Sequence, residues 1–320
     1  MTALKRGLGD PEPRLSGRSE TATQASSLRS PAAAFGALTI DVEDYFQVEA
    51  FAKVIDRRDW DKQQPRIAHN TNRLLDILAA ARVSATFFTL GWIASRNPQL
   101  VRRIVSEGHE LASHGSDHRR VDQQSSHDFR LDARQSKAVL EDISGTRVVG
   151  FRALTFSAGR RTPWFHEILA EEGFLYSSSV YPVAHDLYGE PRAPRRPFCP
   201  IPGFVEVPLT TVRILGRNLQ AAGGGYFRLF PYGMTRKMLC KAGADLRTPC
   251  IFYIHPWEID PGQPRQSQAP LLSRFRHYLN LQRTEQRFLR LLHDFRWGRM
   301  DQLFIGDATG PLPLIQAWTK

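Results

Sequence analysis

The sequence predicts an α/β fold built from parallel strand–helix units. From Gly36 onward, short apolar runs alternate with segments of helical periodicity, and several of the helical segments begin at a proline and end at a glycine. Polar side chains recur directly after the apolar runs, which is the end of the strands where α/β barrels gather their chemistry. No G-x-G-x-x-G motif or phosphate-binding loop follows a predicted strand. These observations favour a barrel-like arrangement over a nucleotide-binding doubly wound sheet.

The first half of the chain divides clearly into predicted elements. The expected strands are residues 37–40, 84–90, 109–113, 147–151 and 174–180. The expected helices are 70–83, with a cap near Asn70 or Thr71, and then 97–108, 126–145 and 162–173. The pattern is less regular over 185–235, where one strand-like stretch covers 204–212. The remaining expected elements are a helix at 231–244, a final strand at 250–254 and one long amphipathic helix over about 270–297.

Composition limits the class of protein. The 320 residues are 42% apolar, which suits one large domain or two small ones with a sizeable core. Three cysteines without C-x-x-C spacing argue against a disulfide framework or structural zinc, and they favour a reducing, cytoplasmic location. No apolar run approaches the roughly 18 residues of a transmembrane helix. Residues 1–34 lack the apolar core of a signal peptide and are predicted to be a disordered leader.

The net charge of +11 is concentrated near the end of the chain. Residues 265–300 hold eight arginines against Glu285 and Asp294. Two interpretations remain open: a solvated arginine-rich helix face, or a surface that holds an anionic polymer or membrane. A nucleic-acid partner is not supported, because no known binding motif accompanies the charge.

Carboxylates crowd together after the first predicted strand, in "ALTIDVEDYF". Asp41, Glu43 and Asp44 lie within four residues, and such crowding raises the pKa of each carboxyl group unless a cation or open solvent relieves it. After the third strand, His114 and His118 are four residues apart, so a helical turn would place both imidazoles on one face. Two histidines and one carboxylate form a metal set with an open position for water. The cluster therefore predicts a catalytic metal site.

Four motifs in this order carry a family resemblance. "TIDVED", "SHGSDH", "GFRALTFS" and "IFYIHP" resemble the motifs of the polysaccharide deacetylases of the NodB-homology type, carbohydrate esterase family 4. The longer phrases "DVEDYFQVEAF", "SSSVYPVAHDLYG", "GGGYFRLFPY" and "FYIHPWEID" resemble the subfamily associated with exosortase (PEP-CTERM) exopolysaccharide gene clusters. The resemblance covers roughly residues 36–317.

The resemblance implies a deformed (β/α)7 barrel with a C-terminal helical extension. The corresponding division is a leader at 1–34, a catalytic domain at 35–260 and an extension packed on the barrel at 261–320. The implied activity is metal-dependent removal of N-acetyl groups from an amino-sugar-containing exopolysaccharide. The implied cofactor is a divalent metal, zinc by preference, with cobalt, nickel or manganese also accepted.

The resemblance also assigns roles to individual residues. Asp41 matches the catalytic base, His114 and His118 match metal ligands, Arg152 matches the arginine that orients the base, and His255 matches the acid that protonates the leaving amine. The carboxylate ligand is Asp44 or Glu43, because this motif is one residue longer than the usual pair of aspartates. We expect Asp44 to be the ligand.

Two positions depart from the family pattern. Leu154 replaces a usual proline, which affects loop rigidity more than chemistry. Ser177 replaces an aspartate that tunes the acid histidine, so His255 is expected to lack a neighbouring anion unless Asp186 or another carboxylate supplies one. His185 is a candidate groove residue, and the remaining histidines are expected to be structural or solvent-facing.

Three functions are compatible with these residues. The first is a deacetylase of an N-acetylated polysaccharide or oligosaccharide. The second is a small-molecule amidohydrolase on the same fold, which a closed pocket would favour over an open groove. The third is a metal-free carbohydrate-binding component of a polysaccharide assembly system, although a binding module need not retain base, ligands and acid together. A glycosidase would not need the histidine pair.

Overall fold

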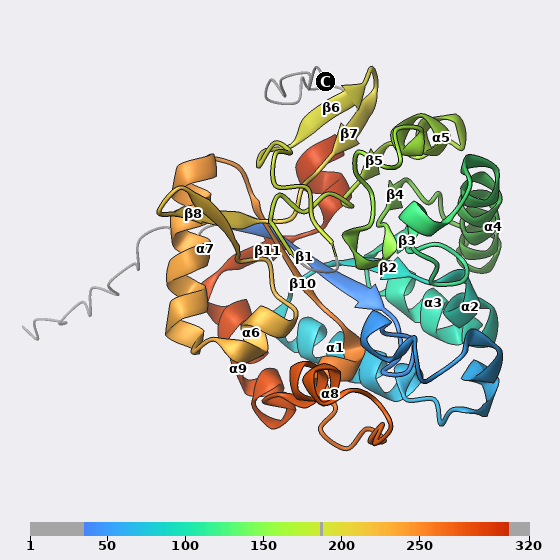
Figure 1. Ribbon diagram of the computed structural model, residues 1–320, viewed down its shortest axis with the longest axis horizontal. Helices are drawn as coiled ribbons and strands as arrows, with labels where there is room; N and C mark the ends of the chain where they lie inside the picture. The colour runs from blue at the N-terminus through green and yellow to red at the C-terminus, as the bar shows by residue number, and fades with distance from the viewer. Residues whose placement is uncertain (1–34, 186–187, 307–320) are drawn as a thin grey trace, which may run out of the picture. The chain divides into compact units, whose positions relative to one another are not determined.

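The computed structural model describes residues 35–185 and 188–306, and its core is a mostly parallel sheet (Figure 1). Seven parallel strands in the described residues follow the order β10-β1-β2-β3-β4-β5-β7. Their bounds are Cys250–Ile254, Phe35–Val42, Thr86–Thr89, Glu110–Ser113, Gly150–Phe151, Tyr176–Ser177 and Phe204–Glu206. The predicted (β/α)7 barrel is thus confirmed, and β6 (Phe198–Ile201) adds an antiparallel edge strand beside β7.

The barrel is deformed between β7 and β10, where the described strands form no ladder with each other. Residues 221–224 lie beside β10 instead: the Tyr253 amide donates to the Ala222 carbonyl at 2.7 Å, and Gly223 forms a single parallel bridge with Tyr253. Gly223 has φ +120, and a Cβ there would lie 2.1 Å from the Tyr253 carbonyl oxygen. Only glycine allows this approach. The hairpin of β8 (Thr211–Ile214) and β9 (Arg217–Gln220) precedes this segment.

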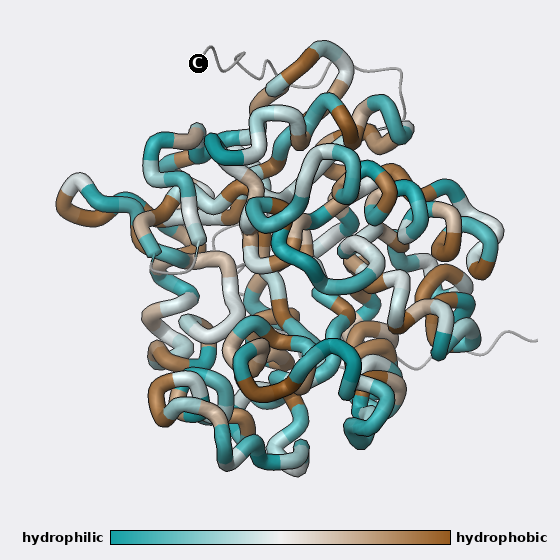
Figure 2. Tube along the Cα trace, turned by 45° about the vertical axis from the view of Figure 1, so that its right-hand side comes forward, coloured by the Kyte–Doolittle hydropathy of each residue, from teal (hydrophilic) through white to brown (hydrophobic). Residues whose placement is uncertain are grey.

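Helices surround the sheet, and their apolar faces supply much of the core (Figure 1). Figure 2 shows hydrophobic and hydrophilic residues interleaved along these outer helices, as amphipathic helices over a buried sheet require. No helix in the described part of the chain is both long and apolar enough to cross a membrane. The helices are α1 (Ile67–Ala81), α2 (Gly91–Arg96), α3 (Pro98–Ser106), α4 (Ser126–Ser144), α5 (Phe165–Glu171), α6 (Gly225–Leu229), α7 (Tyr232–Leu246), α8 (Leu271–Tyr278) and α9 (Leu281–Asp294).

Short helical turns connect several of these elements. They are η1 (Glu49–Phe51), η2 (Arg57–Lys62), η3 (Val121–Gln123), η4 (Leu154–Phe156), η5 (Pro256–Ile259) and the π-helical η6 (Asp301–Ile305). The turns η4 and η5 follow β4 and β10 at the carboxyl end of the barrel, where the sequence places Arg152 and His255.

The C-terminal part of the chain differs from the predicted single helix over 270–297. Asn280 adopts a left-handed conformation with φ 54, which ends α8 and starts α9 in a new direction. Its side-chain amide donates to the Arg228 carbonyl at 2.9 Å, so a tertiary contact holds the break. Residues 296–298 then form β11, which pairs in parallel with the start of β1. The extension therefore contributes a strand to the barrel sheet as well as helices.

Candidate active site

The polar residues predicted at the strand ends converge at the carboxyl end of the barrel. Asp41 lies on β1, while His114, Arg152 and His255 directly follow β3, β4 and β10. Asp41, His114 and His255 line one cavity of about 140 Å³ together with Glu43, Glu49, His118, Ala153, Thr155, Phe156, Tyr188 and Tyr253. The parallel strand order explains this convergence, because all of these strand ends open on the same side.

Glu43, His114 and His118 form the candidate metal centre. Each offers one ligand atom, and these atoms all lie within 4.8 Å of one another. The His114 Nδ1–H donates to the Arg152 carbonyl oxygen at 2.8 Å, which leaves Nε2 as the ligand atom. Burial lowers the pKa of His114 and so favours the neutral imidazole that a metal requires. The donor set and its burial fit a divalent cation with an open position.

Glu43 carries the negative charge of this centre. Burial opposes its ionisation, but His118 and His255 nearby outweigh that effect and lower the pKa of Glu43 to about 2. Its Oε2 contacts His118 Nε2, and its Oε1 lies 3.3 Å from His255 Nε2. The carboxylate therefore lies between one candidate ligand and the candidate acid.

Asp44 faces away from the histidines. The expectation that Asp44 is the carboxylate ligand of the metal is therefore wrong. Its Oδ2 accepts the backbone N–H groups of Arg66 at 2.7 Å and Ile67 at 2.9 Å, and Oδ1 accepts that of Tyr45 at 2.8 Å. Asp44 thus caps the first turn of α1 from another segment. This contact also explains why α1 begins at Ile67, three residues before the predicted cap. Burial, opposed by these bonds, raises the pKa of Asp44 to about 6.

The two histidines come together without the predicted helical turn. Residues 114–118 are not helical, with φ +78 at Gly115 and φ 54 at His118, yet the two rings lie 5.9 Å apart. Asp132 on α4 accepts the Ser116 amide at 3.0 Å and so holds the loop. A Cβ on Gly115 would lie 2.8 Å from the Asp132 carboxylate, which explains the glycine.

Arg152 joins the candidate base to the metal centre. It is fully buried, and its Nη1 donates to Asp41 Oδ1 at 2.6 Å and to Thr39 Oγ1 at 2.7 Å. Nε and Nη2 donate to the carbonyl and hydroxyl oxygens of Ser178, at 3.1 and 3.0 Å. The guanidinium also lies 4.1 Å from the Phe88 ring centre. Asp41 consequently has one oxygen held by Arg152 and the other 3.9 Å from His255 Nε2.

His255 has a carboxylate partner that the sequence analysis missed. Its Nδ1–H donates to Glu258 Oε1 at 2.7 Å, and the same oxygen accepts the His255 backbone N–H at 3.1 Å in a capping box. Burial lowers the pKa of His255, but the charges of Glu43 and Glu258 outweigh it and raise the pKa to about 9. The expectation allowed for another carboxylate in place of the missing aspartate, and Glu258 is that carboxylate; the spacing of "HPWE" already contained the signal.

The remaining departures have simple structural outcomes. Ser177, the last residue of β5, donates its Oγ–H to Ser179 Oγ at 2.7 Å, and Asp186 lies outside the described residues. Leu154 starts η4, in which Thr155 and Phe156 take φ values of 50 and 46 and line the cavity. The backbone after Arg152 is thus shaped by residues with strained φ values, in a chain that has Leu154 at the position where the family usually has proline.

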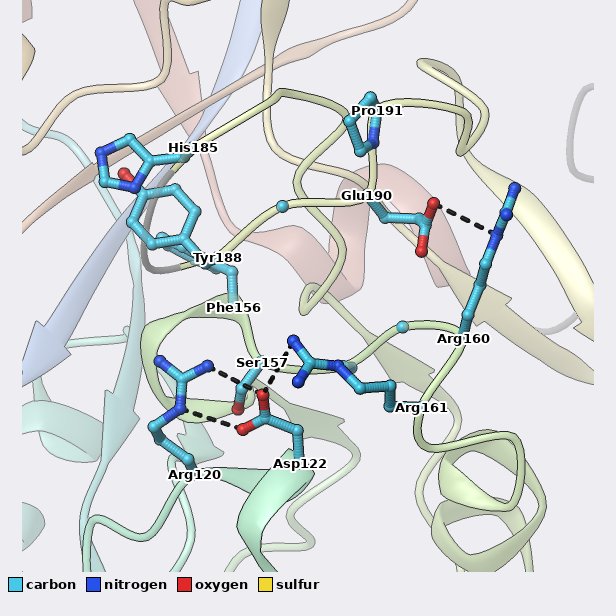
Figure 3. A pocket seen from close by; sticks show the side chains of 13 residues that line it. Arg120, Asp122, Phe156, Ser157, Arg160, Arg161, His185, Tyr188, Glu190 and Pro191 are labelled. Carbon is cyan, nitrogen blue, oxygen red and sulfur yellow. Dashed lines mark hydrogen bonds and ion pairs between the residues drawn. The ribbon is translucent and has the colours of Figure 1, made fainter.

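Three larger pockets adjoin the catalytic cavity and share lining residues with it. One of about 400 Å³ shares Phe156 and Tyr188, one of about 270 Å³ shares Glu49 and His118, and one of about 330 Å³ shares Tyr188 and Tyr253. The first is shown in Figure 3, where Arg160 and Arg161 point toward Glu190 and Asp122. His185 stacks on Tyr188 at 4.0 Å and lines this pocket, in agreement with its candidate place in the groove.

A buried His₂–carboxylate cluster beside a further carboxylate and a histidine, at the carboxyl end of a barrel, is an arrangement that suits a hydrolase. Residues 60–171 match the family model for polysaccharide deacetylases, and residues 178–305 match a domain of unknown function, DUF3473. Over residues 60–171 the chain is therefore similar to the polysaccharide deacetylases. The match over 60–171 contains His114, His118 and Arg152, and the match over 178–305 contains His255. Asp41 and Glu43 precede both matched ranges.

Known proteins agree with this assignment at different levels. A chitooligosaccharide deacetylase of Sinorhizobium fredii is 52% identical over 48 residues, which are 15% of this chain and 22% of that relative. A crystal structure described as that of a polysaccharide deacetylase from Mycobacterium smegmatis matches this chain with TM-score 0.55 at 20% identity. The match covers 91% of this chain and 99% of that one. The allantoinase Puue matches with TM-score 0.52 at 16% identity, covering 86% and 93%. These two structural likenesses concern the fold alone.

Because Glu43 lies in the candidate metal cluster and Asp44 does not, we expect substitution of Glu43, but not of Asp44, to change the metal content. We expect Glu43→Gln to lose most of its bound metal, because it removes the anionic donor of the cluster, as measured by mass spectrometry on protein purified without chelator. Asp44→Asn should retain the metal but lose about 1 kcal/mol of stability, because its cap on α1 is weakened. Metal loss in Asp44→Asn with retention in Glu43→Gln would reverse the assignment.

Proposed function

We propose that this protein is a metal-dependent hydrolase that removes N-acetyl groups from an amino-sugar-containing exopolysaccharide. One observation carries the proposal: Asp41 and His255, 3.9 Å apart, lie beside a buried Glu43–His114–His118 cluster in a single cavity. An amide is a poor electrophile, so its hydrolysis needs an activated water, a stabilised oxyanion and a proton for the departing nitrogen. The cavity offers a group for each of these tasks.

A divalent metal, zinc by preference, would be held by Glu43, His114 and His118. When bound, such a metal lowers the pKa of a ligand water and polarises the substrate carbonyl. The oxygen and nitrogen donors also allow cobalt, nickel or manganese.

Asp41 is placed to accept the proton of the attacking water. Arg152 holds one oxygen of its carboxylate, so the other oxygen points in a defined direction. The contact with the buried guanidinium, at 2.6 Å, holds the carboxylate in place for this role.

His255 is placed to donate a proton to the leaving nitrogen. Glu258 fixes the tautomer by accepting from Nδ1, so that Nε2 faces the cavity and Asp41. Arg228 in turn donates to Glu258 Oε2 at 2.6 Å, which keeps this carboxylate ionised and directed at the histidine.

The arrangement of pockets supports a polymer rather than a small molecule. Open pockets adjoin the catalytic cavity on the sides of Phe156 and His118, so a chain of sugars could extend beyond the reacting unit. The deacetylase relative is named for chitooligosaccharides, which are N-acetylated polymers of this kind. The exopolysaccharide specificity is our inference from the subfamily resemblance.

The second candidate is a small-molecule amidohydrolase, which the fold likeness to allantoinase favours. The surrounding pockets make it the weaker choice. A non-catalytic carbohydrate-binding role is weaker still, because the ligands, base, acid and their supporting residues are all present.

The first test of the function concerns the base. The wild-type protein should release acetate from a chitooligosaccharide, and Asp41→Asn should lower kcat by roughly 10²–10⁴-fold while retaining the metal. Acetate is measured by an enzyme-coupled assay and metal by mass spectrometry. A fully active Asp41→Asn variant would remove this residue from the mechanism.

The second test distinguishes the two enzyme classes. We expect kcat/KM for acetate release to rise with chain length from the disaccharide to the pentasaccharide, because the adjoining pockets bind additional sugars. A cyclic ureide should not be hydrolysed. Turnover of the ureide with no acetate from any oligosaccharide would establish the small-molecule activity instead.

The third test uses pH. His255 must be protonated to act as an acid, so kcat/KM should fall as pH rises through its pKa. A bound metal would offset the charge of Glu43, which otherwise raises the pKa of His255 to about 9. We therefore expect the alkaline limb at a pH between that value and the ordinary histidine pKa of about 6.5.

Glu258→Gln should move the alkaline limb to lower pH, because it removes a charge that raises the pKa of His255. Glu190→Gln is the matched control, since it removes a carboxylate that pairs with Arg160 in the adjoining pocket. An unchanged limb in Glu258→Gln would mean that Glu258 does not set the protonation of His255.

A further inference from the structure

Apolar side chains gather on the outer face of α8. Leu271 is 78% exposed, Leu272 and Phe275 are each 58% exposed, and Leu229 at the end of α6 is 47% exposed. Leu229, Leu272 and Phe275 line the same pocket of about 330 Å³, and Leu271 is the neighbour of Leu272 on α8; these four side chains are here called the α8 patch. Figure 1 shows α8 at the lower edge of the molecule. Such a cluster of exposed large apolar residues marks an interaction site.

The surroundings of the α8 patch are basic. Residues 261–284 contain four arginines, Arg265, Arg274, Arg276 and Arg283, and no Asp or Glu. Among the described residues, Arg265 and Arg274 form no ion pair with a carboxylate, and Arg265 lies over the Tyr278 ring at 4.2 Å. Arg274 lies on α8 itself, one helical turn before Tyr278. The patch therefore combines apolar and cationic side chains.

The arginines further along the basic segment serve other purposes. Arg287 donates to the carbonyl oxygens of Phe227, Arg228 and Phe230 at 2.9–3.2 Å. Arg290 lies over the Tyr232 ring at 4.6 Å, and Arg299 pairs with Asp301. These contacts hold the extension to the barrel, so α8 and the loop before it are the stronger candidates for the surface that would hold an anionic partner.

The inner face of α8 is firmly attached behind the active site. His277 is buried, its ring stacks on Trp257 at 4.2 Å, and Trp257 stacks on His255 at 5.2 Å. The exposed leucines on the other face are thus held in position by a fixed helix. The pocket beneath them shares Tyr188 and Tyr253 with the catalytic cavity, so anything docked on the patch lies next to the active-site mouth.

We propose that the α8 patch docks the protein on an anionic phospholipid bilayer. A helix that lies in the interface buries Leu and Phe side chains at the acyl boundary while Arg side chains bind lipid phosphates. The α8 patch has both components on one face, and its charge is complementary to anionic headgroups. The active site would then open at the membrane surface. This proposal does not depend on the reaction that the site catalyses.

Vesicle co-sedimentation of the full chain, without substrate, tests the proposal. We expect binding to phosphatidylcholine vesicles that contain 30% phosphatidylglycerol and much weaker binding to phosphatidylcholine alone. The double variant Leu271→Ser/Leu272→Ser should bind at least roughly tenfold more weakly. The double variant Arg265→Gln/Arg274→Gln should bind roughly 30-fold more weakly, because each arginine near the surface contributes to lipid binding.

Matched variants elsewhere on the surface control for general hydrophobicity and charge. Leu215→Ser/Leu219→Ser removes two exposed leucines from the β8–β9 hairpin, and Arg102→Gln/Arg213→Gln removes two exposed arginines outside α8. Both should bind vesicles as the wild type does. Circular dichroism and metal content establish that each variant is folded.

Four results would overturn the proposal. The first is that the protein does not bind vesicles at low salt, and the second is that the control variants lose as much vesicle binding as the α8 variants. The third is salt-sensitive vesicle binding that Leu271→Ser/Leu272→Ser leaves unchanged. The fourth is a dimer in analytical ultracentrifugation, without vesicle binding, that Leu271→Ser/Leu272→Ser dissociates; the patch would then be an interface between two copies.

Discussion

The buried ion pair between Arg152 and Asp41 is the constraint on which the rest of the site depends. A guanidinium with no exposed surface requires a carboxylate and full hydrogen bonding, and removing one partner of such a pair typically costs about 3–5 kcal/mol. Arg152 meets this requirement by linking β1, through Thr39 and Asp41, to Ser178 beyond β5. Its own carbonyl accepts from His114. One residue therefore sets the direction of the candidate base and the tautomer of a candidate metal ligand.

A second chain of contacts positions the candidate acid, and it extends into the C-terminal segment. His255 is held by Glu258, Glu258 by Arg228, and Arg228 Nη1 donates to the carbonyl oxygens of His277 at 2.6 Å and Leu279 at 3.1 Å. These carbonyls belong to α8 and its end. The extension thus has a role near the reaction centre, because its backbone supports the carboxylate that orients the acid. The strand β11 and the contacts of Arg287 hold this support against the barrel.

The same extension connects the site to the outer surface. Trp257 lies between the rings of His255 and His277, so the inner face of α8 forms part of the wall behind the acid. The outer face carries Leu271 and Phe275, which are largely exposed. One face of α8 forms part of the catalytic wall and the other face is exposed. The helix therefore fixes the orientation of the cavity relative to whatever binds the exposed face. We infer that this accounts for an apolar surface so near a polar site.

The sequence by itself determined the strand–helix alternation, the barrel class, the residues at the strand ends and the family motifs, because these depend on local periodicity and on residues close together in the chain. Only the tertiary structure decided between Glu43 and Asp44, since the choice depends on the N-terminus of α1, which approaches Asp44 from more than twenty residues away. It likewise showed that the histidine pair meets in a loop held by Asp132 and that Asn280 divides the last helix. Amphipathic periodicity continues through that break, so a pattern of burial alone does not reveal it. Contacts between distant segments gave each of these residues its role.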